Sequence, residues 1–202
     1  PTRRSSDLDL YSLFKIPSSI MTYFANGGEK PGNELSKAFD NNWNTQWFSE
    51  GEQGEEYQNP KTGIKYDSLV NHVIITFQKT VIIDKIVYKT DNCLSCEGIG
   101  YPTKLNIFSK LKKDSSTVLD PYDDSDFILI DNITSDATQD KVLFILKQPI
   151  KCDQIKLEWA DIKTYSPKFS KMTTAKEIMF FTPETQYFNE TILNLFSKKD
   201  YT

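Results

Sequence analysis

Short runs of residues with high β propensity, each bounded by turn-forming residues, recur along this 202-residue chain. In one run Ile155, Leu157 and Trp159 alternate with polar residues, which is typical of a strand with one face on a core and one in water. Almost no helical pattern separates the runs, so we expect an all-β fold, an antiparallel β-sandwich of jelly-roll type. The expected strands span residues 20–25, 72–77, 81–88, 104–109, 127–130, 142–146, 154–159 and 177–181.

A cluster of oxygen donors near the start of the chain is the clearest chemical feature. Residues 35–47 read Leu-Ser-Lys-Ala-Phe-Asp-Asn-Asn-Trp-Asn-Thr-Gln-Trp, which places Asp40, Asn42 and Thr45 between apolar residues. Calcium takes about six to eight oxygen ligands from such tight loops, and backbone carbonyls usually complete the set. A bound ion is one interpretation. In the other, Asp40 only caps a turn, and the later carboxylate Glu177 pairs with a lysine.

Two segments together resemble the discoidin, or coagulation factor type C, domains and the related family 32 carbohydrate-binding modules. Those domains carry Ala-x-Asp-Gly-Asn/Asp-x-x-Thr-x-Trp near the start and Ala-x-Glu-Ile-x-Phe at the end. Residues 38–47 and 175–180 match these patterns in the same order, and the resemblance extends over roughly residues 17–182. It implies a galactose-binding-like β-sandwich with a structural Ca²⁺ that ties the loop to the last strand. The metal ligands that it implies are Asp40, Asn42, Thr45 and Glu177.

One position departs from the loop pattern of these domains. They have glycine after the aspartate, whereas this chain has Asn41. Asparagine is the non-glycine residue that best tolerates a left-handed backbone. We therefore expect the turn to survive the change.

Aromatic and polar residues in three long loops are the candidates for ligand contact. Sugar sites combine an apolar wall with a few placed polar groups. Trp47 follows the loop threonine by two residues, and we expect it to anchor the loop in the core. Galactose-binding relatives commonly have an arginine where this chain has Asp91, so their sugar specificity does not transfer. The glycan-binding candidates are Phe48 and Tyr165 for stacking and Glu50, Asp91, Asn92 and Tyr101 for the remaining contacts.

Composition excludes several classes of function. The net charge of -4 is spread along the chain, so a nucleic-acid partner is not expected. No apolar run approaches the roughly 20 residues that span a bilayer, and a membrane partner is not expected either. The chain has one histidine, His72, in an expected strand, and no serine or cysteine in a nucleophile-elbow context. We therefore expect a binding domain and no enzymatic activity.

The three cysteines leave several alternatives open. Cys93 and Cys96 form a C-x-x-C pair in a loop, and Cys152 lies far downstream. They could form one disulfide, remain free thiols, or serve metal or redox chemistry. Zinc prefers four Cys or His ligands, which this chain does not offer in one place.

Both ends of the chain differ in character from the middle. Residues 1–16 form an N-terminal extension, and its first eight residues resemble one frame of a sequencing adapter, as in a metagenomic gene fragment; a polar linker is the alternative. Apolar residues recur at helical spacing in 183–202, which predicts a C-terminal helix as a linker or the start of a further module.

These features together predict a non-catalytic carbohydrate-binding module. We expect it to target a larger secreted or cell-surface microbial enzyme, either a mucin peptidase or a glycoside hydrolase, to glycans or glycoproteins. Its place would be extracellular or on the cell surface. A protein or phospholipid adhesion domain is the alternative, for which Phe169 between Lys168 and Lys171 is the local sign. A structural spacer without a ligand is a further alternative.

Overall fold

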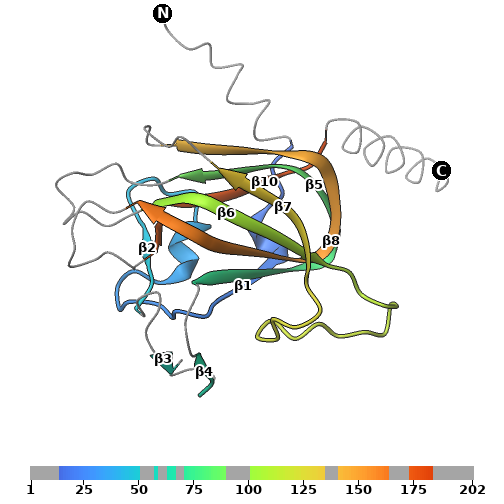
Figure 1. Ribbon diagram of the computed structural model, residues 1–202, viewed down its shortest axis with the longest axis horizontal. Helices are drawn as coiled ribbons and strands as arrows, with labels where there is room; N and C mark the ends of the chain where they lie inside the picture. The colour runs from blue at the N-terminus through green and yellow to red at the C-terminus, as the bar shows by residue number, and fades with distance from the viewer. Residues whose placement is uncertain are drawn as a thin grey trace, which may run out of the picture.

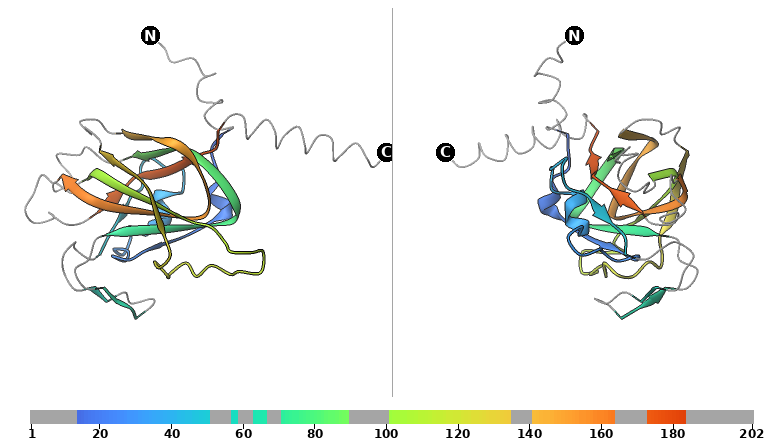
Figure 2. Two further views of the ribbon diagram at one scale, coloured as in Figure 1. Left: turned by 45° about the vertical axis from the view of Figure 1, so that its right-hand side comes forward. Right: turned by 90° about the vertical axis from the view of Figure 1, so that its left-hand side faces the viewer.

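Two long strands, β5 (His72–Lys89) and β8 (Lys141–Lys163), run through both layers of the structure (Figure 1). The computed structural model describes residues 14–50, 57–58, 63–66, 71–89, 101–134, 141–163 and 173–183. The first half of β5 pairs with the second half of β8, and its second half pairs with the first half of β8. Each strand therefore bends back on itself, as Figures 1 and 2 show.

The remaining strands add to these two on either side of the bend. One layer has the order β1 (Met21–Ala25), β5, β8, β6 (Tyr101–Lys110) and β7 (Ile128–Thr134). In the other layer β10 (Glu177–Phe181) pairs with the second half of β5. All of these pairings are antiparallel, which confirms the expected all-β antiparallel fold.

The short elements lie around this frame. Two 3₁₀ helices, η1 (Ser18–Ile20) and η2 (Leu35–Ala38), flank β1 in the chain. The strand β2 (Trp47–Phe48) pairs with β9 (Thr174–Ala175), and β3 (Tyr57–Gln58) pairs with β4 (Lys65–Tyr66). The expected C-terminal helix falls in 183–202, and beyond Pro183 this range lies outside the described residues. Within the described ranges, no helix is long and apolar enough to cross a membrane.

All eight expected runs overlap strands, except that Ile20 belongs to η1 and Phe127 precedes β7, and the runs form fewer and longer strands than the sequence indicated. Residues 72–77 and 81–88 belong to the single strand β5, and residues 142–146 and 154–159 both belong to β8. The residues 78–80 between the first two runs are polar and exposed at the bend, so they interrupt the apolar pattern and divide the strand in a reading of the sequence. The pairing register shifts there, between Thr76 and Val81, which lets the strand change layer without ending.

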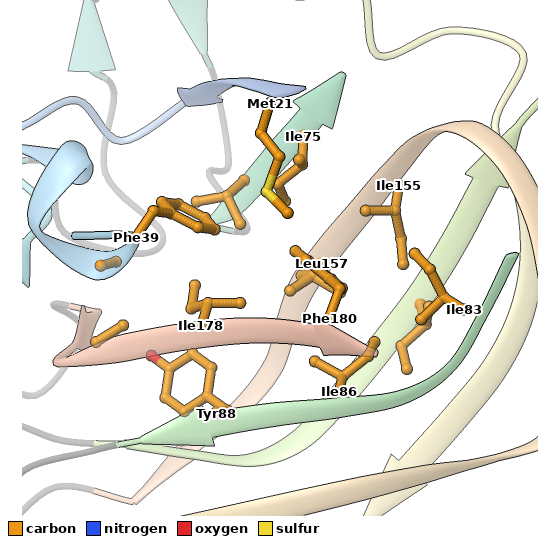
Figure 3. Close-up of a cluster of buried hydrophobic side chains, with 14 of the residues drawn as sticks. Met21, Phe39, Ile75, Ile83, Ile86, Tyr88, Ile155, Leu157, Ile178 and Phe180 are labelled. Carbon is orange, nitrogen blue, oxygen red and sulfur yellow. The ribbon is translucent and has the colours of Figure 1, made fainter. Parts of the chain in front are cut away.

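The core fills the space between the two layers (Figure 3). Ile75 and Leu157 from one layer face Ile86 and Phe180 from the other, and all four side chains are buried. Ile155, Leu157 and Trp159 are buried as their alternation predicted, but the opposite face is not in water as expected. Gln154 is buried with a hydrogen bond to Thr76, and Lys156 is buried over the Phe108 ring. Burying each large apolar side chain stabilises the fold by about 1.5 to 3 kcal/mol.

Two aromatic contacts join the core to the loop region. The Trp47 and Trp159 rings lie 5.8 Å apart, and the Tyr88 and Trp159 rings lie 5.9 Å apart in an edge-to-face arrangement. Trp47 is only 1% exposed, which confirms that it anchors the loop in the core. Trp43, four residues earlier, is 46% exposed.

These two tryptophans give a matched test of the core. We expect Trp47→Ala to lower the free energy of unfolding by about 3 to 5 kcal/mol, because it leaves a cavity beside Trp159. The control Trp43→Ala removes an exposed ring that contacts the Lys89 ammonium, 3.4 Å from the ring centroid, and should cost about 1 kcal/mol or less. Urea denaturation followed by fluorescence measures both. Equal losses in the two variants would contradict the assignment of Trp47 to the core.

Candidate functional site

The segment after η2 forms a loop that is held at both ends by buried apolar residues. Leu35 and Ala38 of η2 are buried at its start, and Trp47 is buried at its end. The indole N–H of Trp47 also donates to the carbonyl of Gly28, 3.3 Å away. Because β2 pairs with β9, which directly precedes β10, these anchors place the loop next to the first residues of β10.

Asp40 closes this loop by accepting hydrogen bonds from within it. Its Oδ1 accepts the backbone N–H of Asn42 at 2.8 Å, and its Oδ2 accepts the hydroxyl of Thr45 at 2.7 Å. The Asn42 side-chain oxygen in turn accepts the backbone N–H of Asn44 at 3.1 Å. The structure therefore contains both contacts of the alternative interpretation, the turn capped by Asp40 and a lysine, Lys15, paired with Glu177.

The backbone at Asn41 is left-handed, with φ of 61°. This confirms the expectation that asparagine replaces glycine here while the turn is retained. The turn also directs the Asn41 side chain towards Lys15, whose ammonium group donates a hydrogen bond to Asn41 Oδ1.

Glu177 is a buried carboxylate at the start of β10. Its side chain is 1% exposed, and its Oε1 lies 3.6 Å from the Lys15 ammonium nitrogen. Burial raises the pKa of Glu177 to about 7; the charge of Asp40 adds to this rise, and the charge of Lys15 opposes it. The structure thus brings Glu177 near the Asp40 loop, although the two segments are far apart in the sequence.

The side chains gathered here fit a hard cation. Carboxylate, carboxamide and hydroxyl oxygens are the ligand types that calcium prefers. Both carboxylate oxygens of Glu177 are buried and have no hydrogen-bond partner at ordinary geometry within the described part of the chain, although Lys15 and the Asn41 backbone lie close enough to lower its pKa. In that part, three or more acidic, histidine or cysteine side chains do not come together as a metal cluster. An ion here would therefore rely on Asp40, Glu177 and neutral oxygens such as those of Asn42 and Thr45.

Two of the glycan-binding candidates are described near the β2 strand. Phe48 is half-buried, and its backbone N–H donates to the carbonyl of Asn33 at 3.1 Å. Glu50 is exposed, and its N–H donates to the carbonyl of Gly27 at 3.0 Å. Tyr101 begins β6, where its backbone pairs with β8. The other candidates, Asp91, Asn92 and Tyr165, lie outside the described residues.

A buried polar network ties together the strand ends beneath this region, and sequence reasoning missed it. Asn26 Oδ1 accepts the backbone N–H of His72 at 2.8 Å, and Ser49 Oγ accepts the N–H of Thr173 at 3.0 Å. The Tyr88 hydroxyl donates to the carbonyl of Thr174. Asn26, which directly follows the expected strand 20–25, was the available signal in the sequence. The network gives the loops a rigid base, and binding residues often lie on such loops.

Cys152 takes no part in the site. It is a free, buried thiol, and burial raises its pKa to about 12, with the charge of Asp153 adding to the rise. A disulfide through Cys152, one of the alternatives left open by the sequence, is therefore not formed. Cys93 and Cys96 lie outside the described residues.

Comparison with known proteins identifies relatives in fold. No family model matches the chain, and no curated protein matches it by sequence. Tandem family 32 modules of ZmpB from Clostridium perfringens, in complex with GalNAc, align with a TM-score of 0.67 at 20% identity. The alignment covers 91% of this chain and 40% of theirs, so this chain spans less than half of that structure. A larger ZmpB structure that includes the M60 catalytic domain also aligns with a TM-score of 0.67, at 22% identity over 90% of this chain and 16% of that one.

Two single modules from the same organism align over nearly their whole length. The family 32 module of NanJ, in complex with galactose, has a TM-score of 0.56 at 18% identity, covering 83% of this chain and 98% of that one. CBM32-3 of a family 31 glycoside hydrolase has a TM-score of 0.60 at 16% identity, and the alignment covers 91% of this chain and 100% of that one. The chain therefore has the fold of the family 32 carbohydrate-binding modules, a galactose-binding-like β-sandwich.

The buried Glu177 predicts a pH dependence of the metal-free chain. Its pKa is about 7 in the folded state and near the ordinary 4.5 when unfolded. Between these values the folded chain holds a proton that the unfolded chain has released, so the free energy of unfolding should fall as pH rises from 4.5 to 7. We expect the free energy of unfolding to fall by about 2 kcal/mol over this range. This is less than the full pKa shift of Glu177 implies, because solvent reaches the neighbouring Lys15.

Urea denaturation in chelator at several pH values measures this loss. Glu177→Gln should remove it. Glu158→Gln is the control, because Glu158 accepts a hydrogen bond from Asn106 on the neighbouring strand and should leave the loss in place. If the free energy of unfolding of Glu177→Gln falls with pH as it does in the unaltered chain, Glu177 is not the group responsible for the pH dependence.

Proposed function

We propose that this chain is a calcium-stabilised, non-catalytic glycan-binding module of a larger secreted or cell-surface microbial enzyme. The single observation that carries the proposal is its fold, which it shares with family 32 modules whose structures hold GalNAc and galactose. The parent enzyme would be a mucin peptidase or a glycoside hydrolase, since similar modules come from ZmpB and from a family 31 glycoside hydrolase. The placement of the Asp40 loop beside Glu177 gives independent support.

In this proposal Ca²⁺ has a structural role. Asp40, Asn42, Thr45 and Glu177 would hold it, together with backbone carbonyls. The ion would supply positive charge to the buried Glu177 carboxylate, whose burial is otherwise costly. These four ligand residues would then hold the loop against β10. Phe48, eight residues after Asp40, would thereby keep a constant position.

Glycans would bind the loops above the buried polar network. Phe48 or Tyr165 would stack on the sugar ring, and Glu50, Asp91, Asn92 or Tyr101 would bond its hydroxyl groups. One aromatic face and two or three hydrogen bonds imply a Kd on the order of 0.1 to 1 mM. A module of this affinity would act by raising the local concentration of a linked catalytic domain, most effectively with further modules.

A glycan array at millimolar sensitivity, containing mucin and plant glycans, tests the function. We expect binding that Phe48→Ala or Tyr165→Ala weakens at least tenfold with the fold intact. Phe127→Ala is the matched control, because Phe127 directly precedes β7 and contacts Lys110 and Lys156. Liposome sedimentation run in parallel tests the adhesion alternative. An empty array, or binding that survives the double loss of Phe48 and Tyr165, would contradict the proposed site.

The calcium role is tested by thermal melting with and without chelator. Calcium at a hundredfold excess over its Kd should stabilise the fold by about 2.7 kcal/mol, because only the folded chain presents the site. Asp40→Ala should abolish this gain. Asp114→Ala is the control, since Asp114 caps an exposed turn with similar bonds, to the backbone N–H groups of Ser116 and Thr117. A melting temperature that is the same with and without chelator would contradict the proposed structural role of calcium.

A further inference from the structure

Lys15 already provides a positive charge at the proposed calcium site. Its ammonium nitrogen lies 3.6 Å from Glu177 Oε1 and donates a hydrogen bond to Asn41 Oδ1. Both side chains are largely covered, with Lys15 20% exposed and Glu177 1% exposed. The pair of Lys147 with Asp131 differs, because that lysine is 81% exposed.

The backbone holds Lys15 in this position. Ile16 N–H donates to the carbonyl of Phe180 at 2.8 Å, and Thr182 N–H donates to the carbonyl of Phe14 at 2.9 Å. Lys15 itself forms an antiparallel bridge with Phe181. The segment therefore runs along the edge of β10, with its main chain fixed on both sides of Lys15.

A calcium ion bound by Glu177 would lie close to the Lys15 ammonium group. Calcium binds carboxylate oxygens at about 2.3 to 2.6 Å, and the Lys15 nitrogen is already 3.6 Å from Oε1 of the same carboxylate. Like charges this close repel, more strongly beside the buried Glu177 carboxylate than beside the exposed Asp40 and Asn42. The lysine side chain has a flexible four-carbon stem, so its ammonium group can swing into water while the backbone stays in place.

We infer that Lys15 is the resident counter-ion of Glu177 and that calcium binds by displacing its ammonium group. This inference rests on the proposed calcium role. Without calcium, Lys15 neutralises the buried carboxylate and keeps the loop side chain Asn41 bonded to the N-terminal segment. Calcium affinity is then reduced by the free energy needed to break the Lys15 contacts. The chain stays folded at low calcium, and Lys15 sets the calcium concentration at which the site fills.

The variant Lys15→Met tests this, because methionine keeps most of the stem and removes the charge. Calcium titration of the chelator-treated full chain by calorimetry should show a Kd at least tenfold lower than that of the unaltered chain. The melting temperature in chelator should fall, since Glu177 loses its counter-ion. Lys37→Met is the matched control: Lys37 lies on η2, next to the same loop, and pairs 3.5 Å from Glu34 on the surface. It should change neither value.

Several outcomes would overturn the inference. An unchanged or weaker calcium affinity in Lys15→Met would do so, as would the absence of calcium binding in both the variant and the unaltered chain. If Lys15→Met does not fold in chelator, Lys15→Gln, which retains a donor for Asn41, replaces it with the same expected direction of calcium affinity. The glycan array is read on the unaltered chain at saturating calcium, so loss of glycan binding and loss of the effect of Lys15 on calcium affinity are distinguished.

Discussion

The continuity of β5 and β8 through both layers is the constraint on which the rest of the structure depends. Each strand supplies one half to each layer, so the two layers are covalently joined at the bend. The bend itself is fixed by Asp153, a buried residue of β8. Its Oδ1 accepts the hydroxyl of Thr80 at 2.6 Å, and its Oδ2 accepts the N–H of Lys112 at 2.8 Å. Because both carboxylate oxygens of Asp153 accept hydrogen bonds, this residue stabilises the bend of β5 and β8, where the backbone hydrogen bonds between the two strands are interrupted.

The Asp40 loop depends on this frame for its position and on its own polar residues for its shape. Hydrogen bonds among Asp40, Asn42 and Thr45 form the turn, and the buried rings of Trp47 and Trp159 set where the turn lies. Burial of the Glu177 carboxylate costs free energy of folding, because a carboxylate buried this deeply needs a positively charged partner. Lys15 is such a partner in the structure, and the proposed calcium ion is another.

Much of the fold and part of the site could be predicted from the sequence, because both have local signatures. Alternation predicted the buried face of Ile155, Leu157 and Trp159, and the backbone tolerance of asparagine predicted the left-handed Asn41. The joining of strand runs into β5 and β8 could not be predicted, because residues at a bend look like residues in a turn. The contact of Lys15 with Glu177 joins residues at opposite ends of the sequence, so no spacing rule indicates it. The position of Asp91, Asn92 and Tyr165 stays a prediction.

The first and last described stretches, 14–50 and 173–183, lie side by side at one point, where Thr182 N–H bonds the carbonyl of Phe14. In Figure 1 this point lies at the opposite side from β2, where the loop candidates begin and with which β9 pairs. Adjacent ends of this kind allow a domain to be inserted into a surface loop of another protein, or to be circularly permuted with a short linker. New ends opened within residues 113–116, an exposed turn, would leave every strand pairing intact. The strand framework could therefore be joined to a host protein at either of two places without a change in its strand pairings.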